Sequence, residues 1–266
     1  VWLKDHHQQV MAHIDKAHVT VNRYSRTNNV VGCSKTRLLH AHLNIEKYRD
    51  EEVSNLKRFT DSFSSTKSKE DAGEPVKLDF DRIKVINSRL IYNDQNSRYK
   101  IDGIDFKHLD IKDLNADIAD LNLDGDDIGF DLLSFSLQER SGLSIKHFSS
   151  KVKISGRSIS VSKASLTTER SKLLMDINFH FGSFKSFSRF ESDVHITSKF
   201  RPSSLHSRDL GYFVPAFYNT YNLLNLKGEI VGTVDNLKAK SLDLQIGESS
   251  SFNGTLELKG LPDIKK

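Results

Sequence analysis

Apolar and polar residues alternate with a period of two along most of this chain, and this feature constrains its fold more than any other. The segments Lys151–Ser155, Ser158–Ser162 and Met175–Phe181 show the alternation clearly, and it recurs around Val76–Phe80 and Ile128–Leu132. Successive side chains of a β-strand point to opposite faces, so a period of two gathers the apolar side chains on one face. The pattern predicts an all-β protein.

Short turn signals separate the alternating segments. They combine Gly, Asn or Asp with other polar residues, as in Ser155–Arg157, Asp124–Asp126, Asp235–Asn236 and Asn253–Gly254. Strands of about five to seven residues between such turns are typical of an antiparallel meander. We therefore expect an elongated, curved antiparallel sheet, a repeating β-groove or open solenoid with loose repeats. A closed sandwich or barrel is the alternative.

Two stretches break the alternation and predict short helices. Ser54 is placed to cap a helix that includes Leu56, Phe59 and Phe63, and Ser207–Pro215 is typical of a capped helical turn. The polar residues 64–75 predict a linker. We expect residues 1–63 to form N-terminal strands with a short helix. Residues 76–266 should form a repeating β-groove that continues beyond this segment.

Composition and charge exclude several classes of protein. Hydrophobic residues make up 37% of the chain, a low share that suits a one-sided sheet better than a thick core. The net charge is +4, and the basic residues alternate with apolar ones instead of clustering, so no nucleic-acid partner is expected. Cys33 is the only cysteine, which excludes an intramolecular disulfide framework and a multi-cysteine zinc site.

One segment resembles a calcium-binding loop. Asp120–Gly125, followed by Asp131 at the twelfth position, matches most of the EF-hand pattern. However, the closing residue is Asp instead of Glu, and Asp127 stands where the loop needs an apolar residue. The flanking segments also alternate with a period of two, whereas an EF-hand requires helices. The sequence therefore favours a β-turn at Asp124–Gly125.

The histidines offer a second candidate metal site. Six of them fall near the start of the chain: His6, His7, His13, His18, His40 and His42. His40 and His42 would share one face of a strand and could chelate a metal together with His13 or His18. Their spacing is generic, and exposed strand histidines are commoner than ligands. We therefore predict no metal and no cofactor.

No catalytic residue is predicted. The acidic residues of the middle region are expected to line a solvated face: Asp102, Asp105, Asp110, Asp113, Asp117 and Asp120. Cys33, within Val30–Ser34, lacks the setting of a known nucleophile. The chain also contains no G-x-S-x-G elbow, phosphate-binding loop or G-x-G-x-x-G fingerprint. We expect a protein that is not an enzyme.

Five short segments, in order, resemble the TamB/AsmA-like family in a version typical of Bacteroidota. Ser141–Ser149 resembles an "SGF-x-hydrophobic-x-x-L-S" element, and Leu166–Leu173 an "L-x-T-x-x-S-x-L" strand pair. Asp209–Pro215 is similar to a "D-L-x-x-F-x-P" turn. Leu226–Leu237 is similar to "L-x-G-x-hydrophobic-x-G-x-V-D-N-L", and Leu258–Ile264 to "L-x-G-L-P-D-I". Leu143 departs from the pattern, because Phe is more usual there.

The resemblance implies a Gram-negative envelope protein in the periplasm, anchored to the inner membrane by a helix that precedes this segment. It implies a long, curved sheet with a greasy concave face that binds phospholipid acyl chains. It also implies a role in phospholipid transfer, outer-membrane assembly or protein secretion. An outer-membrane barrel assembly protein is a candidate partner, reached through a part of the protein beyond this segment.

The alternating residues that we expect to line the lipid groove follow from the apolar pattern. They are Val152, Ile154, Ile159, Val161, Met175, Ile177, Phe179, Val194, Ile196, Leu242, Leu244, Leu256 and Leu258. A structural β-scaffold or adhesin-like module is the alternative, with the same apolar face buried in a closed sandwich.

Overall fold

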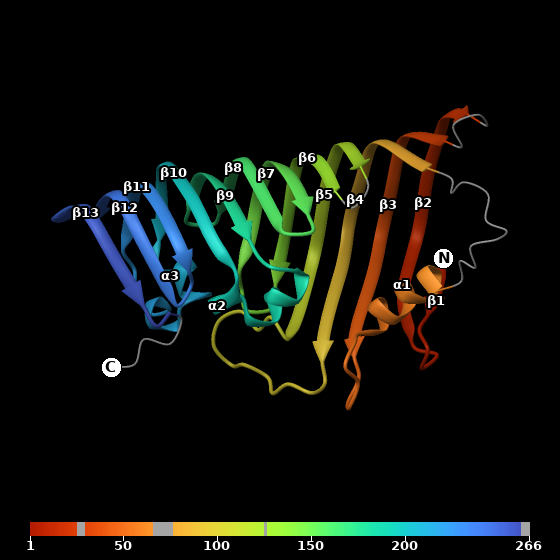
Figure 1. Ribbon diagram of the computed structural model, residues 1–266, viewed down its shortest axis with the longest axis horizontal. Coiled ribbons are helices and arrows are strands. Elements are labelled where there is room, and N and C mark those ends of the chain that lie inside the picture. The colour runs from red at the N-terminus through yellow and green to blue at the C-terminus, as the bar shows by residue number, and fades with distance from the viewer. Residues whose placement is uncertain (26–29, 66–76, 125–126, 262–266) are drawn as a thin grey trace. The chain divides into compact units, whose positions relative to one another are not determined.

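The computed structural model describes residues 1–25, 30–65, 77–124 and 127–261 (Figure 1). Thirteen strands pair in the order of the sequence, from β1 to β13, and the helices are few and short. The predicted all-β class is therefore confirmed. The chain divides into two compact units, which are described separately. Unit 1 comprises Val1–Leu121 with Ser136–Gly142, and unit 2 comprises Asn122–Phe135 with Leu143–Lys266.

Unit 1 contains long strands and one helix. Its elements are β1 (Trp2–Lys4), β2 (Val10–Ser25), β3 (Val30–Lys47), α1 (Asn55–Ser65), β4 (Lys77–Asp94) and most of β5 (His108–Asp124). The expected helix after Ser54 is confirmed: the Ser54 hydroxyl accepts a hydrogen bond from the Lys57 backbone N–H at 3.3 Å. Such a cap satisfies one of the N–H groups that a helix leaves unpaired at its start.

β3 and β4 pair in parallel, with Val30 opposite Lys77 and Lys47 opposite Asp94. This corrects the expectation of a wholly antiparallel sheet. Parallel neighbours need a connection that returns the chain to the starting end of the sheet, and α1 lies in that connection. The expected linker at 64–75 overlaps the end of α1 at residues 64–65. Its remainder lies outside the described residues.

The strands are longer than expected. β2, β3, β4 and β5 have 16 to 18 residues, whereas the sequence suggested five to seven. The cause is visible at His40 in β3 and Asn87 in β4, which have positive φ angles of 51° and 46°. Each interrupts the alternation without ending the strand, as β-bulges do. A sequence pattern broken in this way reads as two short strands.

Unit 2 contains the remaining strands, antiparallel in every pairing from β7 to β13. The strands are β6 (Asp127–Glu139), whose end from Ser136 belongs to unit 1, and then β7 (Ser144–Ser155), β8 (Ser158–Thr168), β9 (Lys172–His180), β10 (His195–His206), β11 (Leu223–Thr233), β12 (Asn236–Ile246) and β13 (Ser250–Lys259). The helical turn expected near Ser207 is confirmed as α3 (Ser207–Gly211), and the 3₁₀ turn η2 (Pro215–Phe217) follows it. The sequence reading did not find η1 (Phe184–Arg189) and α2 (Phe190–Asp193).

A line of irregularities crosses the strands of unit 2. The register shifts on this line fall between Ser149 and Lys151, Val161 and Ala164, Phe200 and Ser203, Lys227 and Glu229, and Ala239 and Leu242. A β-bulge bends its strand and increases the local twist, so successive bulges bend neighbouring strands at the same level. At Gly228, φ is 152° and an added Cβ would lie 2.9 Å from Leu242 Cα, so the bulge in β11 requires glycine.

Side chains replace the hydrogen bonds that the bulges break. Pro202 lies inside β10, although proline has no N–H for the ladder. Beside it, the Ser203 hydroxyl accepts from the Leu174 backbone N–H at 2.9 Å and lies 2.7 Å from the Arg201 carbonyl, to which it donates. In β8, the Lys163 backbone N–H donates to the Asp176 carboxylate at 2.6 Å. Polar side chains therefore hold the sheet together at its bends.

Candidate functional site

Apolar side chains form rows that run across the strands of unit 2. One row joins Ile154, Ile159, Phe179, Ile196, Gly232, Leu237 and Leu258, each a direct cross-strand partner of the next. The next row joins Val152, Val161, Ile177, Ser198, Ile230, Ala239 and Leu256. Opposed residues of neighbouring strands project from the same face, and so do residues two apart in one strand. Both rows therefore lie on one face, which we call the apolar face.

The register places twelve of the thirteen predicted lining residues on the apolar face. Besides those of the two rows, Met175 lies opposite Phe200, Leu244 lies opposite Leu226, and Leu242 lies opposite Gly254. Val194 is different: it follows α2, precedes β10, and is 0% exposed. Ile230, Leu237 and Phe252 lie on the same face but were not among the predicted lining residues. Each follows the period of two, because an apolar residue or a glycine stands two positions away in the same strand.

The opposite face of unit 2 is polar. Between the two apolar rows lies a third row of cross-strand partners: Lys153, Ser160, Asn178, Thr197, Val231, Lys238 and Glu257. The Lys238 ammonium donates to the Glu257 carboxylate at 2.8 Å on this face. The alternation predicted from the sequence therefore separates an apolar face from a polar face over seven strands.

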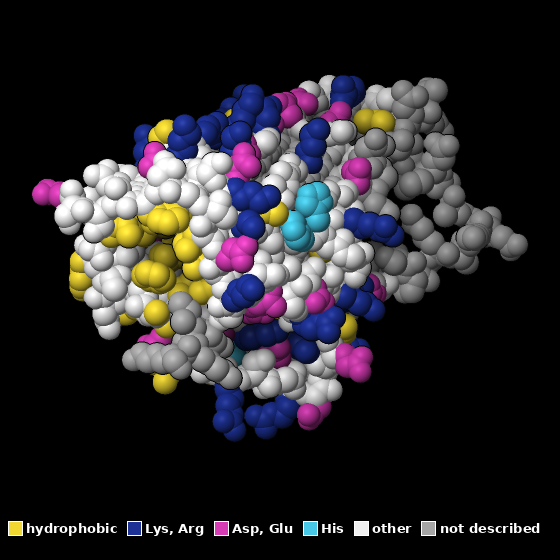
Figure 2. Space-filling model, turned by 60° about the vertical axis from the view of Figure 1, so that its left-hand side comes forward, with side chains coloured by type: hydrophobic (Ala, Val, Ile, Leu, Met, Phe, Trp, Pro, Cys, Tyr) yellow, Lys and Arg dark blue, Asp and Glu magenta, His cyan; other side chains and the backbone are white. Residues whose placement is uncertain are grey.

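The apolar face is more exposed at β13 than on the strands before it. Val152 in β7 is 8% exposed and Ala239 in β12 is 6% exposed, whereas Leu256 and Leu258 in β13 are 37% and 40% exposed. β13 is the last strand in the order, so its side chains have strand neighbours on one side alone. Figure 2, in which the end that carries β13 comes forward, shows hydrophobic side chains gathered around a hollow. Within the described residues of unit 2, no second sheet covers this face.

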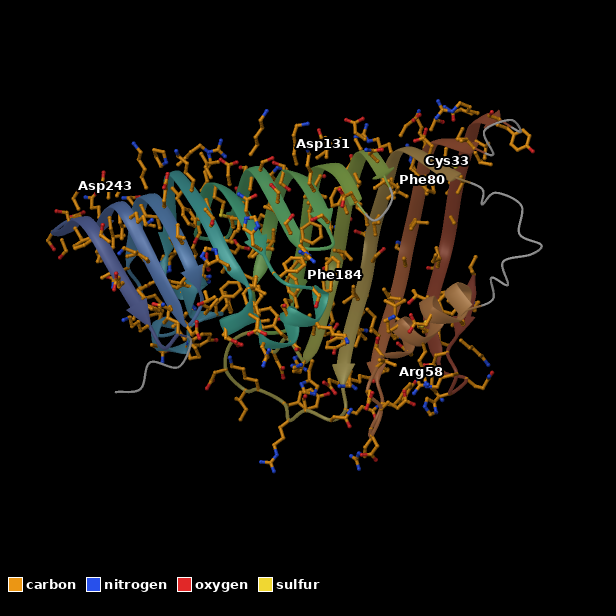
Figure 3. The ribbon with its side chains drawn as sticks, viewed as in Figure 1. Cys33, Arg58, Phe80, Asp131, Phe184 and Asp243 are labelled. Atoms are coloured by element: carbon orange, nitrogen blue, oxygen red, sulfur yellow. The ribbon has the colours of Figure 1, made fainter. Side chains whose placement is uncertain are left out.

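An aromatic segment, residues 184–193 of η1 and α2, packs at one end of the apolar face. Phe190 lies 6.0 Å from Phe179, and Phe187 lies 4.9 Å from Phe181, measured between ring centroids. The Glu191 carbonyl accepts from the Asp235 backbone N–H at 3.1 Å, which attaches the segment to the turn between β11 and β12. Phe184 remains exposed and is labelled in Figure 3.

A buried carboxylate anchors α3 at the other end of the strands. Asp209 accepts hydrogen bonds from the hydroxyls of Thr168 and Ser171, both at 2.6 Å, and from the Arg170 guanidinium at 3.1 Å. Thr168, Arg170 and Ser171 belong to the β8–β9 connection, so α3 is fixed to that turn. Because a desolvated carboxylate needs such partners, Asp209 is a structural residue in this arrangement.

Unit 1 has an apolar face of its own, which the sequence reading left out of the site. One row joins Ala17, Leu38, Val85 and Ala116, and another joins Val21, Cys33, Phe80 and Leu121. Cys33 is buried in β3 and lies opposite Phe80 of β4; both residues are labelled in Figure 3. Its thiol therefore lies in an apolar row, a setting typical of structural cysteines.

Two of the acidic residues of the middle region, Asp110 and Asp117, are paired with arginines across β4 and β5. Arg89 donates to both oxygens of Asp110 at 2.9 and 2.8 Å, and Arg82 to both oxygens of Asp117 at 2.7 and 2.6 Å. These hydrogen bonds hold the pKa values of both carboxyls below their usual range. Bidentate arginine pairing leaves these carboxylates poorly suited to acid–base catalysis.

Asp105 is buried, which corrects the expectation that it lines a solvated face. It accepts from His108 Nδ1 at 2.8 Å and from the backbone N–H groups of Lys100 and Lys107 at 2.7 and 3.0 Å. In the segment that resembles an EF-hand, Asp120 lies in β5 and Asp131 in β6, so strands flank it. The expected turn residue Gly125 lies outside the described residues. Asp131, labelled in Figure 3, pairs with Lys151.

The six histidines near the start of the chain form two groups in unit 1, with His18 apart from both. His13 and His42 are cross-strand partners whose ring centroids lie 6.2 Å apart, and Asp15 pairs with His13 and His40. The register instead places His18 opposite Arg37 in β3.

His6 and His7 lie elsewhere in unit 1, against Glu51. Hydrogen bonds from His6, His7 and Arg58 lower the pKa of Glu51 to about 2.

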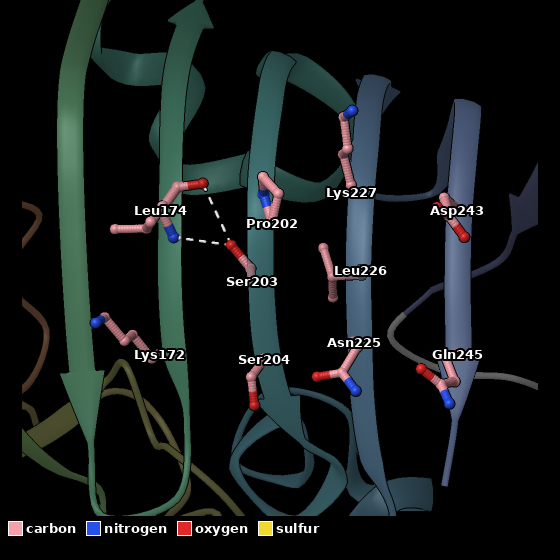
Figure 4. Close-up of a pocket in the computed structure, with 10 residues that line it drawn as sticks. All are labelled: Lys172, Leu174, Pro202, Ser203, Ser204, Asn225, Leu226, Lys227, Asp243 and Gln245. Carbon is pink, nitrogen blue, oxygen red and sulfur yellow. Dashed lines mark hydrogen bonds between the residues drawn. The ribbon is translucent and has the colours of Figure 1, made fainter. Parts of the chain in front are cut away.

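A hollow of about 530 Å³ lies over β9–β12 of unit 2 (Figure 4). Its polar lining includes Lys172, Ser204, Asn225 and Gln245, which are successive cross-strand partners. These positions alternate with the apolar rows, so the hollow opens mainly on the polar face. It lies beside the bulge at Pro202, and no cluster of catalytic groups lines it.

Comparisons with protein-family models, with curated proteins and with solved structures give no match for this chain. Among the described residues, no helix combines the length and the apolar character needed to cross a bilayer. The site is therefore defined by its own geometry: two registered apolar rows on one face of unit 2, exposed at β13 and flanked by the aromatic segment.

Proposed function

We propose that this protein is a periplasmic part of an envelope-biogenesis protein of the TamB/AsmA-like type, and that its apolar face binds lipid acyl chains. Lipid binding by this face would serve phospholipid transfer or outer-membrane assembly. The single observation that carries the proposal is the register of unit 2, which aligns apolar side chains across seven strands while the opposite face stays polar.

The dimensions of the apolar face suit an extended acyl chain. A six-residue strand spans about 20 Å at roughly 3.3 Å per residue, which is comparable to such a chain. Each methylene group removed from water contributes roughly 0.8 kcal/mol. Because the rows repeat with little change from strand to strand, an acyl chain would meet similar side chains along the face. Movement along it would then encounter no single deep binding site.

The polar face and the exposed strand β13 also support lipid binding. Lysines and serines on the opposite face keep that side in water, and the phospholipid headgroup would remain solvated. Leu256 and Leu258 expose apolar surface on β13. Contiguous apolar surface of this kind is typical of interaction sites rather than of a bare soluble surface. Periplasmic location, inner-membrane anchoring and an outer-membrane barrel partner belong to the same proposal and rest on the family resemblance.

A structural β-scaffold is the second candidate. The observation that favours it is the burial of Val152, Met175 and Leu242, which are all below a tenth exposed. In that case the apolar face would be a packing core, sealed by another layer. Acyl chains would cover the apolar rows in the first case, and another protein layer would cover them in the second. Measuring the lipid that co-purifies with the protein therefore distinguishes the two candidates.

The experiment places charges in the apolar rows. The double variant Ile154→Asp with Ile177→Asp should abolish co-purifying lipid, measured by mass spectrometry of organic extracts. The matched control is Lys153→Asp with Asn178→Asp, because these neighbouring positions lie on the polar face. The control should retain the lipid. Circular dichroism of both variants checks that the strands persist.

Two results would contradict the proposal. One is an unchanged lipid-to-protein ratio in the Ile154→Asp, Ile177→Asp variant that keeps its fold. The other is wild-type protein that carries no lipid after expression in a Gram-negative host and after incubation with phospholipid vesicles. The scaffold candidate predicts this second result.

A further inference from the structure

Three side chains with metal-ligating atoms converge in unit 1, far from the apolar face in sequence. His6 and His7 lie in the turn between β1 and β2, and Glu51 lies between β3 and α1. Glu51 Oε1 is 3.0 Å from His6 Nε2 and 2.9 Å from His7 Nε2, and all three ligand atoms lie within 4.8 Å of one another. We propose that His6, His7 and Glu51 bind one divalent transition-metal ion, with Zn²⁺ as the best-fitting candidate.

The geometry is close to that of a bound ion. Zinc bonds to histidine nitrogen and carboxylate oxygen are about 2.0 to 2.2 Å long, so tetrahedral ligand atoms lie about 3.3 Å apart. The two distances from Glu51 to the imidazoles are within a few tenths of an ångström of that separation. Two imidazoles and one carboxylate form a ligand set that suits zinc and leaves a fourth position for water.

The β1–β2 turn is held in place before any ion binds. Asp5, which is 6% exposed, accepts from the backbone N–H groups of His7 at 2.9 Å and Gln9 at 3.0 Å. Its other oxygen accepts from the Tyr48 hydroxyl at 2.6 Å and from the Asn55 amide at 3.0 Å. These bonds connect the turn to the end of β3 and to the start of α1. The histidines therefore need little reorganisation, which favours binding.

The neighbouring side chains orient the ligands. The His7 ring packs against the Tyr48 ring, with 4.1 Å between centroids. Arg58, on α1, donates from Nε to Glu51 Oε2 at 3.1 Å, which leaves Oε1 directed at both histidines. The guanidinium charge opposes a nearby cation, so the site should bind more weakly than one with a free carboxylate. We expect micromolar affinity.

The bound ion would join three parts of unit 1: the β1–β2 turn, the segment after β3 and, through Arg58, the first turns of α1. No local sequence pattern indicates the site, because Glu51 lies 44 residues after His7. The proposal is independent of lipid binding in unit 2.

Calorimetric titration of the 266-residue chain with Zn²⁺ at pH 7.5 tests the site. The wild type should bind one ion. His6→Ala, His7→Ala and Glu51→Gln should each weaken binding by at least tenfold. The matched control is His13→Ala with His42→Ala, which removes the other close histidine pair of unit 1 and should leave the affinity unchanged. Co²⁺ should give visible absorption bands in the wild type and the control, and weaker bands in the three site variants.

Melting curves without metal show whether each variant folds, and His6→Gln with His7→Gln replaces any alanine variant that does not. The proposal is overturned if the wild type shows no saturable Zn²⁺ binding. It is also overturned if the folded site variants bind as tightly as the wild type, or if the His13→Ala, His42→Ala control loses the binding instead.

Discussion

Units 1 and 2 both carry registered apolar rows, but they hold their opposite faces together in different ways. In unit 1, arginines bind carboxylates bidentately across β4 and β5, as Arg89 binds Asp110. In unit 2, the corresponding face is a row of lysine, serine, threonine and asparagine, with an exposed pair between Lys238 and Glu257. The apolar register is thus the feature common to both units, and the polar face can vary.

The units also differ in how their strands pair. Unit 1 joins a parallel pair through α1 and places the positive-φ residues His40 and Asn87 at the same level of β3 and β4. Unit 2 is antiparallel from β7 to β13 and aligns its bulges in a line across the strands. The second arrangement presents a regular series of apolar side chains between its bends. That regularity is why the lipid proposal concerns unit 2.

The largest expected effect is the loss of a buried apolar side chain. Leu242→Ala in unit 2 and Met11→Ala in unit 1 should each lower the free energy of unfolding by about 2–4 kcal/mol, because both side chains are buried. Leu258→Ala should lower it by less than about 1 kcal/mol, since Leu258 is exposed. Urea denaturation followed by circular dichroism measures all three. An equal loss for Leu258→Ala would mean that another layer covers β13.

Removing a buried polar side chain that anchors a helix should have the second-largest effect on the free energy of unfolding. Asp209→Ala in unit 2 and Asn55→Ala in unit 1 each remove a side chain that holds a helix to the sheet, and each should cost about 1–3 kcal/mol. Hydrogen exchange should rise locally, at α3 in the first case and at α1 in the second. Exchange that rises uniformly over the whole chain in either variant would show that the anchor stabilises more than its own helix.

The smallest effect concerns the ion pairs and depends on pH. Arg89 lowers the pKa of Asp110, so this pair stabilises the fold above the unfolded pKa, about 3.9, and its contribution is lost as pH falls through the lower folded value. Asp110→Asn should cost about 0.5–1 kcal/mol at pH 7, a figure reduced because Arg89 is partly exposed to solvent.

The same comparison at pH 3 should show a smaller difference between Asp110→Asn and the wild type, as the wild-type carboxyl begins to be protonated. Glu257→Gln, on the polar face of unit 2, serves as the control and should change the melting temperature little at either pH, because both members of its pair are exposed. A constant Asp110→Asn difference from pH 7 to pH 3 would rule out the ion pair as its cause.

Alternation was enough to predict the all-β class and the residues of the apolar face, but not the length of the strands in unit 1. Ile154, Ile159 and Phe179 follow a period of two, and the structure makes them successive cross-strand partners. The bulges could not be predicted in the same way. Lys163 and Ser241 have positive φ angles, which neither residue type favours, so only the pairing of the neighbouring strands reveals them.

Local signals also explain which helices were found. Ser54 is a recognisable cap, and α1 follows it. The aromatic segment was missed because its signal is short: Phe184, Phe187 and Phe190 are spaced three apart, which is helical spacing, but over barely two turns. The approach of His6 and His7 to Glu51 lies beyond any local pattern, because it depends on the pairing of β1 with β2 and on the path of the chain after β3.

The central claim is that the apolar face of unit 2 holds acyl chains, and photocrosslinking tests it most directly. A benzophenone amino acid is placed at Leu256, at Leu258 or at Glu257, which lies between them on the opposite face, and the protein is irradiated with labelled phospholipid. The account predicts crosslinked lipid at Leu256 and Leu258 and none at Glu257. Equal crosslinking at all three positions, or crosslinking at Glu257 alone, would contradict it.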